Sequence, residues 1–134
     1  MSTVRMTING QAFELWIADD HESRARGLMF ITADQMAPLA DGTMRGMMFV
    51  FPAAMDLHFW MKNTIIPLDI AYADTGGRVT AIHTMAPLDE DSSKYGSGSP
   101  ARYAIEVNAN VFTGLGLKPG DMIAIPNSLL NPSP

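Results

Sequence analysis

Residues 47–51, Met-Met-Phe-Val-Phe, are apolar at every position, and no other run constrains the fold as strongly. A strand of this kind must be covered on both of its faces by other parts of the protein. The chain has 134 residues, the length of one ordinary domain, and only 17% of them are charged. A domain of this size buries roughly two-thirds of its unfolded surface. We therefore predict one domain over residues 1–134, with an ordered core at about 4–125 and a frayed tail at 126–134.

Short strands between turn signals fill most of the chain. Asn9-Gly10, a strong hairpin signal, separates the strand-like residues 4–8 and 11–18. Further strands are predicted at residues 47–51, 57–61, 68–73, 78–85, 101–108 and 122–125. The pattern predicts a mainly β single domain, in which antiparallel strands form a barrel-like or folded sheet with one or two short helices.

Two other segments differ from the strand pattern. Asp19 is placed to cap a helix and Glu22 to complete a capping box, so we predict a short helix that ends at about Met29. Residues 86–100 form a polar loop rich in Asp, Ser and Gly, longer than most connections in compact domains. Loops of this length are often mobile or functional.

The composition argues against several classes of function. The formal net charge is −5 and the nine Lys and Arg residues are scattered singly, so the basic cluster that sequence-independent nucleic-acid binding needs is missing. The chain has no cysteine, which excludes disulfides and thiolate zinc sites. No segment approaches the roughly 18 continuous apolar residues that span a bilayer, and residues 1–6 lack an apolar signal core. We expect a cytoplasmic protein from the chain as written, or an exported one if a signal peptide was removed. The sequence leaves the oligomeric state open.

Methionine and histidine do not form a recognisable metal site. Eleven methionines could supply thioether ligands for Cu(I), but several lie among aromatic and aliphatic residues, which favours a role as core filler. The methionines crowded into the first half are Met44, Met47, Met48, Met55 and Met61. The three histidines have no close helical or strand spacing. We therefore expect no metal and no cofactor.

Residues 59–70 are the first place to look for a functional site. They combine two large rings, a thioether, an amide, a proline and a carboxylate, too apolar for a solvated loop and too polar for a plain core strand. Alternation places Asp69 on the same face of its strand as Ala71 and Ala73, which leaves room beside the carboxylate. Within this segment the candidate ligand-binding residues are Trp60, Asn63 and Asp69.

The strand at 101–108 supplies two more candidates, Arg102 and Glu106, which share a face. If this face meets that of Asp69, the two carboxylates border one cleft and could carry out general acid–base chemistry. Structural roles are equally open. Arg102 and Glu106 could form an ordinary surface pair, and Asp69 could accept hydrogen bonds from Asn63 or Thr64 and hold the preceding turn.

Five blocks of the sequence, in order along the chain, resemble a known family. The blocks are Arg26–Phe30, Gly46–Phe51, Phe59–Thr64, Pro67–Ile70 and Ala101–Val107. Across residues 4–125 they are similar to a bacterial and archaeal family, the domain-of-unknown-function family 192. The resemblance implies a single β-rich domain without an established activity, in a family whose members often look exported. One departure is Asn110, where the family usually has Gly; Asn tolerates positive φ well enough to keep the turn.

Three hypotheses for function remain. The first is a binding or accessory module with a cleft near Trp60, Asn63, Asp69 and Glu106, suited to a small polar molecule or a sugar. The second is a hydrolase, acting on glycosides, with Asp69 and Glu106 as paired carboxylates. The third is a protein-interaction module that uses loop 86–100. The sequence favours binding over catalysis.

Overall fold

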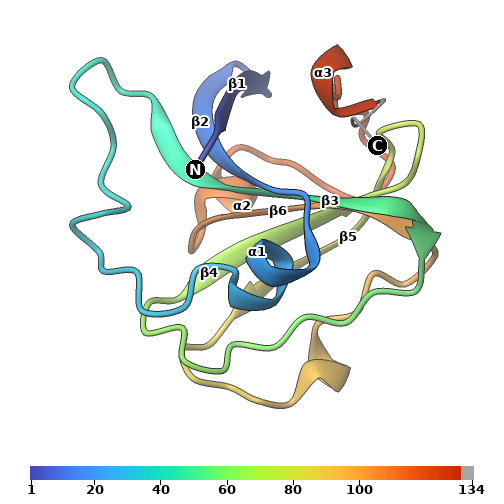
Figure 1. The fold of residues 1–134 in the computed structure, drawn as a ribbon. Helices are drawn as coiled ribbons and strands as arrows, with labels where there is room; N and C mark the ends of the chain where they lie inside the picture. The colour runs from blue at the N-terminus through green and yellow to red at the C-terminus, as the bar shows by residue number, and fades with distance from the viewer. Residues whose placement is uncertain (131–134) are drawn as a thin grey trace.

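The Asn9-Gly10 hairpin begins a six-stranded sheet that forms the centre of the molecule (Figure 1). The computed structural model describes residues 1–130. The strands are β1 (Thr3–Ile8), β2 (Gln11–Ala18), β3 (Met44–Met55), β4 (Leu68–Ala73), β5 (Val79–Met85) and β6 (Ala101–Asn108), in the order β1-β2-β3-β6-β4-β5. The helices within the described residues are α1 (His21–Arg26), the 3-10 turn η1 (Ser92–Lys94), α2 (Val111–Gly114) and α3 (Asn127–Leu130). The predicted mainly β single domain is confirmed.

The pairing of β2 with β3 is parallel, where the sequence predicted antiparallel strands throughout. A parallel pair needs a crossover of a dozen or more residues. Residues 19–43 supply it, because they carry α1 and a long irregular stretch between the two strands. The other four pairings are antiparallel, and β1 and β5 lie at the edges of an open sheet.

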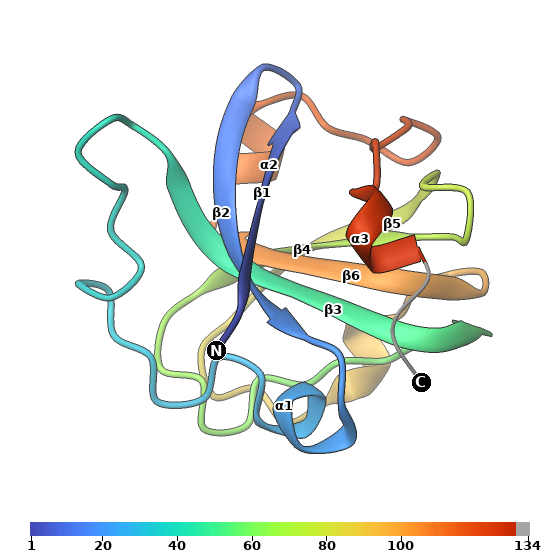
Figure 2. The same ribbon diagram turned by 45° about the horizontal axis from the view of Figure 1, so that its top comes forward.

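The sheet is buried on both faces, as the apolar run in β3 requires. On one face, which we call the α2 face, Met48 and Val50 pack with side chains that include Phe112 of α2. On the other, the α1 face, Met47 and Phe49 pack with a separate cluster of buried residues. Figure 2 shows α2 and α3 on one side of the sheet and α1 on the other.

α1 is capped one residue later than the sequence suggested and ends at Arg26, short of the predicted end at about Met29. Asp20, rather than Asp19, is the N-cap: its carboxylate accepts a hydrogen bond of 2.7 Å from the Ser23 backbone N–H. Ser23 completes the capping box in place of Glu22. Asp suits the N-cap, and both Ser and Glu can complete a capping box. The spacing alone therefore did not decide between Asp19 with Glu22 and Asp20 with Ser23.

Two predicted strands are wrong. Residues 57–61 and 122–125 contribute only isolated bridges, His58 with Gly96 and Arg78 with Met122. Of the expected tail at 126–134, residues 127–130 form α3 and bury Leu129, whereas residues 131–134 lie outside the described part of the chain.

Loop 86–100 fastens residues 57–64 to the rest of the domain. The Met61 N–H donates to the Asp89 carbonyl at 2.6 Å, and the Leu88 N–H donates to the Thr64 carbonyl at 2.9 Å. Ser97 is buried and exchanges two hydrogen bonds with the backbone of Leu57, of 2.8 and 3.0 Å. Residues 57–64 therefore run a fixed course without belonging to the sheet.

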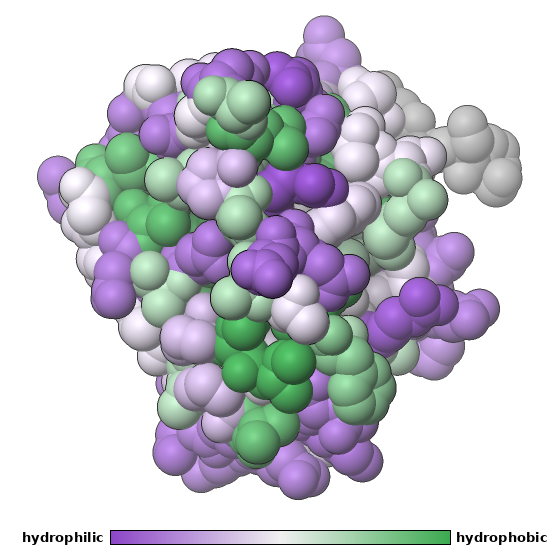
Figure 3. All heavy atoms as spheres, turned by 90° about the vertical axis from the view of Figure 1, so that its left-hand side faces the viewer, coloured by the Kyte–Doolittle hydropathy of each residue, from purple (hydrophilic) through white to green (hydrophobic). Residues whose placement is uncertain are grey.

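On the side of the molecule that carries residues 30–43, the exposed apolar side chains do not form one large patch. Figure 3 shows several separate apolar patches there, divided by hydrophilic side chains. Within residues 1–130, no helix combines the length and the apolar character needed to cross a membrane.

Candidate binding pocket

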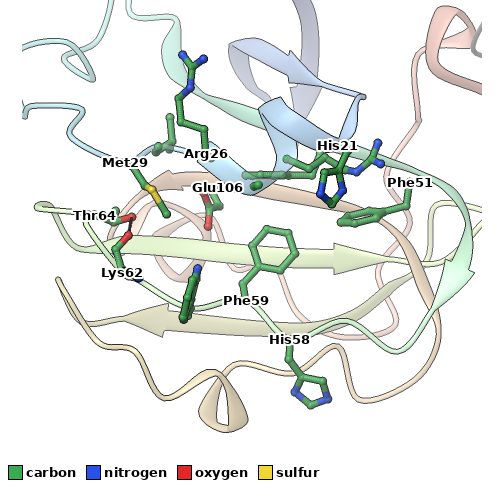
Figure 4. Close-up of a pocket in the computed structure, with 15 residues that line it drawn as sticks. His21, Arg26, Met29, Phe51, His58, Phe59, Lys62, Thr64 and Glu106 are labelled. Carbon is green, nitrogen blue, oxygen red and sulfur yellow. Dashed lines mark hydrogen bonds between the residues drawn. The ribbon is translucent and has the colours of Figure 1, made fainter.

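A pocket of about 260 Å³ lies on the α1 face of the sheet. Its walls come from four places in the chain: α1 and the turn after it, β3, residues 58–64, and β6. Figure 4 shows Glu106 and Phe59 at its centre, with Met29, Lys62 and Thr64 at one end and His21 and Phe51 at the other. Segments far apart in sequence thus build one pocket that is open to solvent.

Glu106 is the buried polar group of this pocket. It lies on β6 opposite Met47 of β3 and Ile70 of β4, so its side chain points to the α1 face. Only 4% of the residue is exposed, and no hydrogen bond joins its carboxyl group to another residue within 1–130, but its oxygens are open to the pocket. Burial raises the pKa of Glu106 to about 8. At neutral pH the group is therefore mostly an uncharged carboxylic acid, able to donate one hydrogen bond and accept others.

Aromatic rings form the apolar wall beside Glu106. The Phe59 ring lies 4.8 Å from that of Phe49 and 5.6 Å from that of Tyr72, at an interplanar angle of 84° in both pairs. Such edge-to-face contacts are the preferred arrangement of aromatic pairs. Tyr72 also holds the backbone of this segment, because its hydroxyl donates to the Tyr95 carbonyl and accepts from the Phe59 N–H at 3.2 Å. The wall is thus fixed before any ligand arrives.

Two cations lie at the ends of the pocket. Arg24 of α1 donates from Nη1 to the Val50 carbonyl at 3.1 Å, and its guanidinium lies 5.2 Å from the centre of the Phe51 ring. Lys62 places its ammonium 5.2 Å from the centre of the Trp60 ring. Within residues 1–130, neither cation has a carboxylate partner within 4.0 Å.

Gly27 forms the turn that positions one wall of the pocket, the residues just after α1. It ends α1 with a φ of 52°, a value that favours glycine, and its N–H donates to the Ser23 carbonyl at 2.9 Å. A side chain there would also lie 3.4 Å from the Phe49 ring. The glycine lets the chain turn sharply over the aromatic wall and lead into Leu28 and Met29, which line the pocket.

Three non-glycine residues with positive φ are joined around the segment that lines the pocket. Phe30, Asn63 and Leu88 have φ values of 63°, 58° and 64°. The Phe30 N–H donates to the Asn63 carbonyl at 2.9 Å, and Leu88 donates to the neighbouring Thr64. Bulky side chains rarely adopt this backbone conformation, and it persists where the surrounding structure holds it. These bonds tie together the turn after α1, residues 58–64 and loop 86–100.

Comparison with known proteins identifies the family. The model of domain-of-unknown-function family 192, described as "Uncharacterized ACR", matches residues 4–125. The chain belongs to this family. Its resemblance to family 192 at the level of sequence blocks is thereby confirmed.

Two solved structures resemble this family-192 domain over nearly its whole length. One is a Sinorhizobium meliloti 1021 protein, provisionally described as a transcription regulator, with 33% identity, a TM-score of 0.73, and coverage of 91% of this chain and 90% of that one. The other is a protein of unknown function from Novosphingobium aromaticivorans DSM 12444, with 31% identity, a TM-score of 0.74, and coverage of 92% and 83%. A search of curated proteins finds no match.

Of the five candidate residues, the family-192 fold brings Trp60 and Glu106 to the pocket and leaves out the others. Trp60 is 45% exposed. Asn63 forms the turn described above, and its amide lies 3.9 Å from the sulfur of Met29. Arg102 points elsewhere: its guanidinium donates to the Phe51 carbonyl at 3.1 Å and to the Leu130 carbonyl at 3.2 Å. Arg102 therefore anchors α3 and forms no pair with Glu106.

Asp69 is fully buried and faces the opposite side of the sheet. Its carboxylate accepts hydrogen bonds from the Thr84 hydroxyl at 2.7 Å and from three backbone N–H groups, those of Asn110, Phe112 and Thr113, at 2.9, 3.1 and 3.4 Å. The carboxylate thus holds the turn that leads into α2. Asn110 has a φ of 70°, which agrees with the tolerance expected for Asn at this position.

The predicted partners of Asp69 are therefore wrong, although a turn-holding role was among the alternatives. Asn63 and Thr64 form no hydrogen bond with Asp69. Asp69 and Glu106 also do not border one cleft, because the sheet lies between their side chains.

Sequence analysis missed most of the pocket wall. Arg24 falls within the predicted helix without being singled out, and Phe59 falls within a predicted strand that does not form. Both lie in or beside blocks that carry the family resemblance, which is the signal that could have drawn attention to them. Within residues 1–130, no group of three or more His, Asp or Glu side chains is placed to hold a metal ion.

Proposed function

We propose that this domain is a binding module for a small polar molecule, which lies in the α1-face pocket against Glu106 and Phe59. The observation that carries the proposal is the state of Glu106: a buried acid with no hydrogen-bond partner among the described residues, placed in a pocket. Because its carboxyl oxygens reach the pocket space, a ligand there can donate to or accept from Glu106, and such a hydrogen bond contributes roughly 0.5–1.5 kcal/mol.

The size and lining of the pocket support a small, ring-containing ligand. Ligand pockets usually measure about 300–1,000 Å³, so a volume of about 260 Å³ lies just below this range. Flat aromatic walls suit the face of a ring, which can be a sugar or a heterocycle. Specificity then comes from few polar groups, with Glu106 the most buried of them.

Binding is favoured over glycoside hydrolysis by the carboxylates available. Both common mechanisms need two carboxyl groups flanking the bond that breaks. Glu106 is the acidic residue that lines this pocket, and Asp69 lies across the sheet with its oxygens engaged by four hydrogen-bond donors. The pocket therefore has a group that can hold a ligand and lacks the second carboxylate of a glycosidase.

In this proposal loop 86–100 supports the pocket and does not itself bind a partner. Its hydrogen bonds to Leu57, Met61 and Thr64 hold the segment that forms one pocket wall. A protein-interaction function would use the outer side of this loop and would not involve the pocket.

A ligand screen followed by NMR tests the proposal. Mixtures of monosaccharides, amino acids and small organic acids are added to the 15N-labelled protein, and the backbone amides that shift are mapped. We expect the shifts to centre on Phe59, Glu106 and the turn at Gly27. A Phe59→Ala variant should lose them, whereas a Phe30→Ala variant, changed at a largely exposed ring, should keep them. Hits that map only to other surfaces would overturn the proposal.

A further inference from the structure

The charges around the pocket indicate which kind of molecule it binds. We propose that the ligand is a small organic anion, with its ring or apolar body on Phe59 and its charged group paired with the cations at the ends of the pocket, Arg24 foremost. This inference rests on the proposed function, since it names the chemical class that the same pocket takes.

The pocket is positively charged in a protein that is negative overall. The chain carries nine Lys and Arg residues against fourteen Asp and Glu, for a formal net charge of −5. Three of the nine cations, Arg24, Arg26 and Lys62, line this one pocket, and Glu106 is the acid that lines it. Because Glu106 is uncharged at neutral pH, the charges in the lining do not cancel. A pocket lined by one sign of charge attracts ligands of the opposite sign.

Arg24 is the best placed of the three cations. Its hydrogen bond to the Val50 carbonyl and its position over Phe51 hold the side chain in one place, so little conformational entropy is lost on binding. Only Nη1 is used for that bond, which leaves other N–H groups of the guanidinium for an oxyanion. Planar guanidinium groups pair with carboxylate and phosphate through two parallel hydrogen bonds.

Arg26 contributes less than its position in the lining suggests. Its guanidinium lies 3.8 Å from Glu22, both side chains are largely exposed, and the side chain points away from the pocket in Figure 4. Exposed pairs of this kind are weak and strongly screened. Arg24 and Lys62 therefore supply the charge that a ligand meets.

A cationic ligand would fit the same pocket poorly. An amine could pair with Glu106 only after the acid gave up its proton, which burial opposes. The amine would also meet Arg24 and Lys62. An anion faces neither cost, and its neutral polar end can still exchange hydrogen bonds with the acid form of Glu106.

Three probes that share one ring test the inference. Para-hydroxybenzoate, para-hydroxybenzamide and para-hydroxybenzylamine present an anion, a neutral amide and a cation on the same body. Each is titrated into the 15N-labelled protein at about pH 6 and low salt, where exposed and partly exposed charges are least screened. We expect the benzoate to bind about tenfold more tightly than the amide, and the amine to bind weakest.

Variants assign the effect to a residue. Arg24→Gln should weaken the benzoate about tenfold and leave the amide unchanged. Arg5→Gln, which removes an exposed arginine on β1 that does not line the pocket, should change neither affinity. Arg24→Lys should bind the benzoate more tightly than Arg24→Gln but less tightly than the wild type. Lysine keeps the positive charge but cannot form the two parallel hydrogen bonds of a guanidinium group.

Two outcomes would overturn the inference, and they differ in what they imply for the proposed function of small-molecule binding. If the amide or the amine binds the pocket as tightly as the benzoate, the anionic class is wrong while small-molecule binding stands. If no probe shifts the pocket amides, the inference is again overturned, and the broader screen alone decides the proposed function.

Discussion

Asp69 and Glu106 lie on neighbouring strands of the sheet and point to opposite faces of it. Asp69 pairs with Val107 across β4 and β6, and Glu106 pairs with Ile70, so the two carboxyl groups are one position out of phase. Side chains alternate along a strand, and the sheet therefore separates them. One carboxylate is saturated with hydrogen bonds and stabilises the fold; the other has no partner among residues 1–130 and borders a pocket. Two acids that look alike in sequence have different roles.

The first prediction concerns stability and Asp69. Asp69→Asn should lower the free energy of unfolding by about 2–4 kcal/mol, because an amide nitrogen would face backbone N–H groups that the carboxylate now satisfies. Urea unfolding measures the change. Asp74→Asn is the matched control, since Asp74 accepts two backbone N–H bonds in an exposed turn, and it should cost less than about 1 kcal/mol. Equal losses in the two variants would contradict the structural role.

The second prediction concerns stability and the pH dependence of Glu106. Its pKa is raised by burial from 4.5 to about 8, so between these values the folded protein binds more protons than the unfolded chain. The free energy of unfolding from this group therefore falls as pH rises through that window. Glu106→Gln stays neutral throughout and should flatten the dependence. Near pH 8 it should be more stable than the wild type by on the order of 3 kcal/mol.

Urea unfolding of both proteins at a series of pH values between about 4.5 and 8 checks this prediction. Glu22→Gln serves as the control, because the Glu22 side chain is 87% exposed and its removal should leave the slope of the wild type intact. If Glu106→Gln and the wild type showed parallel curves, Glu106 would not be protonated in the folded protein at neutral pH.

Much of the sheet could be predicted because its signals are local. The strands at 68–73 and 101–108 and the Asn9-Gly10 hairpin were predicted with their observed limits, since each is bounded by turn residues and follows a period of two. The relation between two strands is not local. Alternation grouped Asp69 with Ala71 and Ala73 as observed, but the register of β4 against β6 decides which faces coincide.

The pocket could not be predicted for a related reason. Phe59 looks like a strand residue and Arg24 like a helix residue, and neither pattern says that α1 folds over residues 58–64. The partners of Asp69 lie about forty residues further along the chain, beyond the reach of turn rules. That no described residue forms a hydrogen bond with Glu106 is a property of the packed structure, and it leaves no mark in the sequence.

The third prediction concerns the affinity for anions above neutral pH. As Glu106 ionises near its pKa of about 8, it places a negative charge in the pocket and should weaken the binding of unsubstituted benzoate, a probe with no group of its own that titrates in this range. The other titratable or charged groups in the lining are His21, Arg24, Arg26, His58 and Lys62. All of these groups are also present in Glu106→Gln, so a pH dependence that this variant lacks belongs to Glu106. The loss between about pH 7 and 9 therefore reports on Glu106.

NMR titrations of the probe across this range supply the measurement. In Glu106→Gln the affinity should stay constant between about pH 7 and 9, while the wild type loses roughly tenfold. A wild-type affinity that did not change with pH, with the probe bound at the pocket, would show that Glu106 does not face the anion.

The last prediction concerns the strained backbone at Phe30. Its φ of 63° costs a bulky residue roughly 1–2 kcal/mol, and its ring is 66% exposed, so little packing is lost when the side chain is removed. Glycine relieves the strain and gives back about 0.5–1 kcal/mol as chain entropy. Phe30→Gly should therefore raise the free energy of urea unfolding by about 0.5–1 kcal/mol. Met122, 65% exposed with no positive φ, is the matched control, and Met122→Gly should destabilise the protein by about 0.5–1 kcal/mol. If both glycine variants lost stability equally, the positive φ at Phe30 would cost the fold nothing.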